Sequence, residues 1–277
     1  MTERRPGAGG ILLRAATVLG PLFLAVLLGV PLLALLLRVP AADVLGRLAE
    51  PEVLRALRLS LFTSAVATGL VVLLGLPTAY LMASRRFPGK RVIEVILDLP
   101  MVLPPTVAGF ALLLAFGRNG LLGSTLGAFG VTLPFTTLAV VVAQVFMAVP
   151  FFVAPVRAGF GAVERRYLDA AATLRAGEGY TFRRVMLPLS LPSVLAGTGM
   201  AWARALGEFG ATITFAGNLP GRTQTMPLAV YVDLQGDLDR AVALSVLLLL
   251  MSAILLLALR YSPVGLFGRK TDAPLHR

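Results

Sequence analysis

Cysteine is absent from the 277 residues of the chain, and histidine occurs once, at His276, one residue before the last. The absence of cysteine excludes disulfide bonds and thiol chemistry. A single histidine leaves too few ligands for a His/Cys metal site and no base for a histidine-dependent catalytic triad. We therefore expect the chain to bind no metal and no cofactor and to carry no catalytic residues.

Charged residues are also scarce, at 14% of the chain, whereas hydrophobic residues make up 57%. A soluble domain carries about a quarter charged residues, so this chain has too little polar surface to face water on every side. A bilayer accepts helices of about 20 consecutive apolar residues. The composition predicts an all-α fold, a polytopic bundle of membrane-spanning helices.

Six apolar segments are long enough to cross a bilayer. The first follows Arg4, Arg5 and Arg14 and has no small-residue cleavage site after it, which favours an uncleaved signal anchor. Outside the segments, we expect an amphipathic surface helix in residues 38–58 and a compact outer loop in residues 118–134. The six segments are residues 15–37, 59–83, 95–117, 135–157, 189–216 and 241–260.

Basic residues exceed acidic ones by 11, but they lie in short clusters between apolar runs. A nucleic-acid-binding chain would gather them on one soluble face, so nucleic acid is not expected as a partner. With a cytoplasmic N-terminus, cytoplasmic segments carry 17 Lys and Arg residues and outer segments 7, with Arg204 inside a span. The positive-inside rule then places both termini in the cytoplasm and the chain in the cell (inner) membrane. Three parts are expected: an anchor with its outer segment (1–58), a transmembrane core (59–260) and a cytoplasmic tail (261–277).

Prolines fall inside two of the segments. Pro104 and Pro105 lie in the third segment, and Pro150 and Pro155 lie in the fourth. Each proline removes a backbone hydrogen bond, which membranes tolerate where neighbouring helices or a water-filled cavity satisfy the freed carbonyl. We expect helix breaks in both segments, as a moving pathway requires. Asp98, near the cytoplasmic end of the third segment, is expected to cap its helix or to pair with a basic residue that precedes it.

The cytoplasmic stretch of residues 164–188 is the most informative part of the chain. Its first half has a helical composition, with Leu168, Ala171 and Leu174 recurring at three- and four-residue spacing, and Gly177 is expected to stop the helix. A helix that lies crosswise between two spans and projects small and charged residues is suited to dock into another protein. We therefore predict a docking helix here.

The same stretch resembles the EAA loop of ABC importer permeases, in which E-A-A, three residues, G and nine residues precede I-x-L-P. Here Asp169 replaces the usual Glu, and Arg175 stands in place of the Gly, while Leu187 and Pro188 keep the register. Because that Gly permits the turn after the helix, we expect the helix to end slightly later here. The resemblance implies that residues 164–177 form a coupling helix that fits a groove on an ATPase subunit. The residues that it assigns to this contact are Glu164, Tyr167, Asp169, Ala170, Ala171, Leu174, Arg175, Gly177, Leu187 and Pro188.

Other stretches are similar to the sulfate, molybdate and tungstate permeases, notably residues 87–90, 98–100 and 203–211. Residues 217–228 are closer to the molybdate and tungstate branch. The resemblance implies import of molybdate (or tungstate), with sulfate as the alternative substrate. It also implies a homodimer that works with two ATPase subunits, which bind ATP and Mg²⁺, and with an extracytoplasmic binding protein that selects the oxyanion.

Arg204 and Glu208 are charged residues inside the fifth segment. They are four residues apart, so on one helix they share a face and can pair. They line the translocation pathway or its gate, or else they form a neutralised structural pair; the second interpretation is favoured because Glu208 would repel a dianion. Thr212 and Thr214 could offer hydroxyl groups to an oxyanion, although threonines more often bond to carbonyls of their own helix.

The sequence lacks the features of two other classes of membrane protein. For ATP binding, the nearest match to a P-loop is residues 265–271, which lack its spacing, and no nucleophile with a base is evident for an intramembrane enzyme. An ion-coupled secondary transporter would show inverted repeats and buried ionisable relays, and neither is apparent. The sequence therefore favours a translocation subunit that performs no covalent chemistry.

Overall fold

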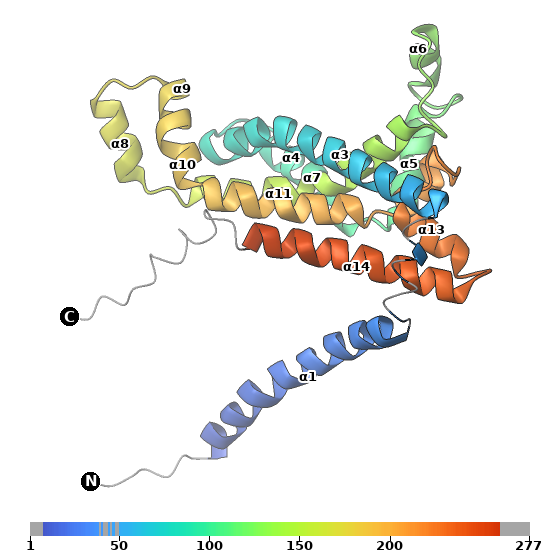
Figure 1. The fold of residues 1–277 in the computed structure, drawn as a ribbon. Coiled ribbons are helices and arrows are strands. Elements are labelled where there is room, and N and C mark those ends of the chain that lie inside the picture. The colour runs from blue at the N-terminus through green and yellow to red at the C-terminus, as the bar shows by residue number, and fades with distance from the viewer. Residues whose placement is uncertain (1–7, 39, 41–43, 45, 48–49, 261–277) are drawn as a thin grey trace.

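Regular structure in the described part of the chain is entirely helical, which confirms the predicted all-α class (Figure 1). The cytoplasmic tail predicted for residues 261–277 lies outside this part, as do the two arginines before the signal anchor. The computed structural model describes residues 8–38, 40, 44, 46–47 and 50–260.

Four continuous helices are long and apolar enough to cross a membrane. A fifth candidate is a bent pair, residues 178–189 and 191–206, whose two parts meet at 72°. The third predicted segment is divided into α4 (Lys90–Val102) and α5 (Pro105–Phe116), and the fifth into α11 (Leu191–Leu206) and α12 (Gly210–Ala216). The four continuous helices are α1 (Ala8–Arg38), α3 (Pro51–Ser84), α7 (Thr137–Gly161) and α14 (Leu238–Arg260).

The prolines act differently in the two segments that contain them. The third segment breaks after Val102, and Pro105 then begins α5, where a missing N–H costs nothing. The fourth segment does not break, because Pro150 and Pro155 lie inside the continuous helix α7. The predicted break there is therefore wrong. α7 lies between α3 and α11, and these neighbours pack along it and hold it as one helix.

α7 forms the centre of the bundle. Phe152, Val153 and Val156 of α7 are buried against residues of α3 and α11. α5 and α12 pack closely as well, since a Cβ on Gly109 would lie 2.6 Å from the carbonyl oxygen of Ala211. By contrast, most of α1 stands apart from the bundle, although Leu35 near its C-terminal end packs against a buried cluster that includes residues of α3 and α14, and none of its apolar window is buried within the chain (Figure 1).

The outer connections differ from the sequence prediction. Residues 51–58 begin α3 rather than forming a surface helix, and Val44 is buried among residues of α3, α13 (Met226–Asp233) and α14. This apolar face therefore packs on the bundle instead of lying on the membrane. The loop expected to be compact instead carries α6 (Gly123–Ala128), which projects from the bundle, and Leu121 beside it is largely exposed (Figure 1).

Candidate functional site

The stretch predicted to dock, residues 164–188, forms two arms at one end of the bundle together with Leu189 (Figure 1). We call residues 164–189 the coupling segment. The first arm is α8 (Arg165–Thr173). The return arm, residues 178–189, leads through the 72° bend at Ser190 into α11. The return arm consists of α9 (Glu178–Thr181), the π-helix η1 (Phe182–Met186) and α10 (Leu187–Leu189).

α8 ends earlier than the sequence predicted. The N–H of Arg175 donates to the carbonyl of Ala172 at 2.9 Å, and that of Ala176 donates to the carbonyl of Ala171 at 3.0 Å. These two bonds form the Schellman motif, which needs a left-handed residue at its turn, and Arg175 supplies it with φ of 54°. Gly177 has an ordinary φ of −65°. The helix therefore stops at Thr173, and Arg175 adopts the conformation that a glycine would adopt at lower cost.

Exposure separates the residues assigned to docking into two groups. Leu174, at the tip between the arms, is 82% exposed, which is unusual for a leucine in a water-facing turn. Ala171 is 7% exposed, so its side chain is covered within the chain and is not available to a partner in this structure. Leu187 is half-buried. The others are exposed: Glu164, Tyr167, Asp169, Ala170, Arg175, Gly177 and Pro188.

Two ion pairs order the coupling segment. The Arg166 Nε lies 2.8 Å from a Glu164 oxygen, and the Arg166 guanidinium also stacks 4.9 Å from the centre of the Tyr167 ring. The Glu164 carboxylate raises the pKa of Arg166. A second pair joins Arg85, just after α3, to Glu178 at the start of the return arm.

A cavity of about 500 Å³ lies between the coupling segment and the bundle. Tyr80 of α3 and Phe160 of α7 line it on the bundle side, and Leu168 and Ala172 line it from α8. α8 is therefore held away from the ends of α3 and α7 over part of its length.

Arg204 and Glu208 do pair, but they do not share one helix. α11 ends at Leu206, and Glu208 lies in the break before α12. An Arg204 nitrogen is 2.5 Å from one Glu208 oxygen, and the other oxygen accepts the N–H of Ala211 at 2.8 Å. Glu208 is completely buried, whereas the Arg204 side chain is 21% exposed. Glu208 thus connects the two halves of the broken fifth segment.

The neighbouring threonines behave differently from each other. Thr214 donates to the carbonyl of Gly210 at 2.9 Å within its own helix, as threonines commonly do. Thr212 is fully buried, and its hydroxyl has no hydrogen-bond partner among the described residues. Nothing in this arrangement brings either threonine to Arg204, and their role in a pathway stays a prediction.

Asp98 is paired differently from the prediction. An oxygen of Asp98 lies 4.0 Å from a guanidinium nitrogen of Arg157 on α7, and Glu94, one turn earlier on α4, lies 3.3 Å from another. The expected partner among the preceding basic residues is therefore wrong. The carboxylates at 94 and 98 share one face of α4, and that spacing is the sequence signal that could have indicated a common partner.

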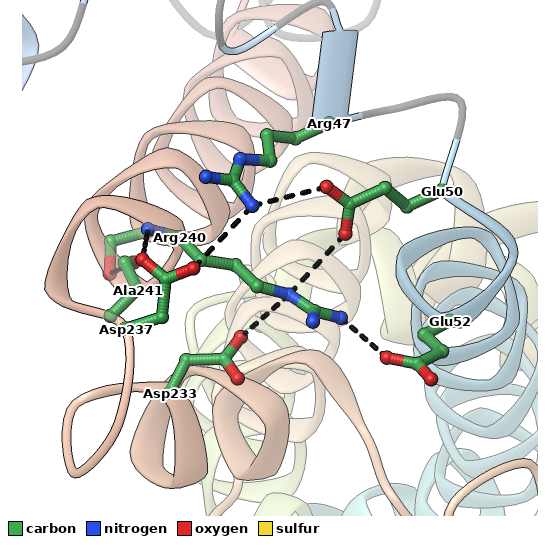
Figure 2. A network of polar contacts seen from close by, with 8 residues as sticks. Arg47, Glu50, Glu52, Asp233, Asp237, Arg240 and Ala241 are labelled. Atoms are coloured by element: carbon green, nitrogen blue, oxygen red, sulfur yellow. Dashed lines mark hydrogen bonds and ion pairs between the residues drawn. The ribbon is translucent and has the colours of Figure 1, made fainter.

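Sequence reasoning missed a charge network at the opposite end of the bundle (Figure 2). Arg240, near the start of α14, lies at its centre and contacts three carboxylates from α13 and the start of α3. Burial raises the pKa of Asp233, and Arg240 opposes this. Local spacing could not reveal the network as a whole, because it joins residues 47–52 to residues 233–240. Its contacts are Arg240 with Glu52 (2.8 Å), Asp233 (3.2 Å) and Glu50 (3.4 Å), and Arg47 with Glu50 (3.2 Å) and Asp237 (3.6 Å).

Comparison with known sequences identifies permeases of transport systems as relatives of this chain. The family described as "Binding-protein-dependent transport system inner membrane component" matches residues 72–267. The molybdenum transport system permease protein ModB of Mycobacterium tuberculosis is 45% identical over 216 residues, covering 78% of this chain and 82% of that protein. The ModB protein of Escherichia coli K12 is 42% identical over 65% of this chain and 80% of its own length. The sulfate transport system permease protein CysT of Salmonella typhimurium is 34% identical over 79% of each chain.

Solved structures agree on the fold. A bacterial ABC transporter involved in the import of the acidic polysaccharide alginate matches with a TM-score of 0.72. The match covers 94% of this chain and 96% of that one, at 14% sequence identity. The alginate transporter in complex with a periplasmic protein bound to an alginate pentasaccharide matches with a TM-score of 0.74, over 90% and 93% of the two chains.

Proposed function

Since the chain belongs to the family of binding-protein-dependent transport system inner membrane components, we propose that it is the permease of an ABC importer for molybdate or tungstate. The choice of substrate rests on the 45% identity to a molybdenum permease over most of both chains, compared with 34% identity to a sulfate permease. Residues 217–228, with their resemblance to the molybdate and tungstate branch, support the same choice.

We further propose that the chain works as a homodimer with two ATPase subunits and an extracytoplasmic oxyanion-binding protein. ATP and Mg²⁺ would be bound by the ATPase subunits, and this chain would bind no cofactor. The exposed tip of the coupling segment at Leu174 supports docking of an ATPase. The unburied apolar surface of α1 is available to membrane lipid and to a second copy of the chain.

The transport mechanism follows from these partners. ATP binding draws the two ATPase subunits together, and the coupling segments move with them. The broken third and fifth segments are the points at which the bundle can deform, because their backbone hydrogen bonds are already interrupted there. The bundle then alternates between access from outside and access from the cytoplasm. This chain changes which side is open and supplies no covalent chemistry.

Both termini are proposed to be cytoplasmic, and single cysteines can test this orientation in the naturally cysteine-free chain. Leu174→Cys and Leu121→Cys place thiols at sites where the side chains are 82% and 87% exposed. A membrane-impermeant maleimide should label Leu121→Cys in intact spheroplasts and Leu174→Cys only in inside-out vesicles. The reverse pattern would contradict the proposed orientation.

The proposed function is tested by ATP hydrolysis of the complete complex in lipid vesicles. Molybdate or tungstate, with the binding protein, is expected to stimulate hydrolysis several-fold, whereas sulfate should not. Omission of the binding protein is the control and should remove the stimulation. Stimulation by sulfate alone would keep the importer and overturn the substrate. An assembled complex that no oxyanion stimulates would contradict the proposed function.

A further inference from the structure

Three aromatic rings join the return arm to the spanning helices. Phe182, the first residue of η1, lies 4.8 Å from the Tyr80 ring of α3 and 5.9 Å from the Phe160 ring of α7, measured between ring centres. Tyr80 and Phe160 are themselves 6.0 Å apart, with their planes at 83°. Each ring therefore contacts the other two, and one ring from each of three elements meets at this point. We call these residues the ring cluster.

The ring cluster lies beside the cavity between α8 and the bundle, and the two differ in how they pass on movement of the coupling segment. α8 reaches the main core through Leu168, whereas the cavity of about 500 Å³ separates another part of α8 from the ends of α3 and α7. The ring cluster borders the same cavity. All three of its rings pack on the main core of the bundle, so no open space separates them from it. Packed side chains transmit displacement, whereas an open space absorbs it.

The return arm is held against the bundle at two points. At its bend, Gly159 of α7 is so close to α11 that a Cβ there would lie 2.4 Å from the Ser193 side chain. η1 is a π-helix, a rare form that is found mostly at functional sites. The arm is thus fixed to α7 at the bend and to α3 and α7 at Phe182.

We propose that Phe182 is a positioning residue that passes the movement of the coupling segment to α3 and α7 through Tyr80 and Phe160. The proposal rests on the proposed function, because it presupposes an ATPase that moves the coupling segment. It adds to that function the contact by which ATP hydrolysis is converted into opening of the bundle. A purely structural role for Phe182 would make a different prediction, since it would affect assembly and leave each assembled complex fully coupled.

The test measures molybdate uptake and ATP hydrolysis in parallel, for the whole complex in vesicles. Phe182→Ala and Phe182→Leu remove the ring, and Phe182→Tyr is the conservative control. Tyr80→Ala and Tyr80→Phe form the matched pair on α3, because the phenylalanine keeps the ring that contacts Phe160 and Phe182. The ring-deleting variants should hydrolyse ATP but take up about tenfold less molybdate per ATP, as expected for loss of an allosteric coupling. The ring-retaining variants should keep the wild-type ratio.

The role of Phe182 can be contradicted in two ways. If the ring-deleting variants assemble and keep the wild-type uptake per ATP, the positioning role is wrong. If uptake and hydrolysis fall together with the amount of assembled complex, or if no ring-deleting variant assembles, Phe182 is structural and the proposal is overturned. A wild-type complex without oxyanion-stimulated hydrolysis would instead refute the proposed function, so the two failures are distinguishable.

Discussion

Leu174→Asp is expected to abolish oxyanion uptake while the permease stays folded in the membrane. Leu174 is the most exposed apolar side chain of the coupling segment, at 82%, so its replacement disturbs no packing within the chain. In contact with an ATPase, however, the leucine would lose its water, and an aspartate there would be buried without a partner. A central interface contact is worth about 2 kcal/mol or more, so binding should weaken by at least about thirtyfold.

The measurement is the amount of ATPase that co-purifies with tagged permease, followed by uptake in vesicles. Leu174→Met is the matched control, because it keeps an apolar side chain of similar size and should bind normally. The thermal unfolding midpoint of the isolated permease should be the same for both variants. Normal co-purification and uptake by Leu174→Asp would remove the case for docking at this tip.

Ala171→Asp separates docking from packing. Ala171 is the buried residue of α8, at 7% exposure, so an aspartate there would be buried within the chain rather than presented to a partner. We expect this variant to lower the unfolding midpoint of the permease alone, which Leu174→Asp should not do. Ala171→Asp should therefore act by destabilising the permease, whereas Leu174→Asp should act by weakening its contact with the ATPase.

The all-helical class, the apolar segments and the coupling segment could be predicted from sequence because each depends on local pattern. Apolar length sets the spans, and the spacing between Asp169 and Pro188 marks the coupling segment. Even the strong pairing of Arg204 with Glu208 could be expected from their separation of four. Their arrangement could not, because the helix ends between them at Leu206 and the pair closes across the break.

What could not be predicted depends on contacts distant in sequence or on backbone strain. Pro104 coincides with a helix break and Pro150 does not, because the helix around Pro150 is packed between α3 and α11. Arg175 adopts a left-handed turn that sequence reasoning reserves for glycine, and so the helix end was placed too late. The partners of Arg240 are brought together only by the folded bundle.

Arg204→Met is expected to destabilise the permease more than loss of both charges does. The single substitution leaves Glu208 fully buried without its ion pair, and breaking a buried pair from one side costs about 3 kcal/mol or more. The thermal unfolding midpoint in detergent should fall clearly, and less monodisperse protein should be recovered. An unchanged midpoint for Arg204→Met would show that the pair contributes little to the fold.

The double variant Arg204→Met with Glu208→Gln then separates structure from transport. The glutamine oxygen can still accept the N–H of Ala211, and no charge remains buried, so stability should recover most of the loss. If the pair is structural, uptake should recover with stability, and this is the result we expect because Glu208 already neutralises the charge that would attract an oxyanion. A stable double variant that no longer transports would instead place Arg204, with its 21% exposed side chain, on the pathway of the anion.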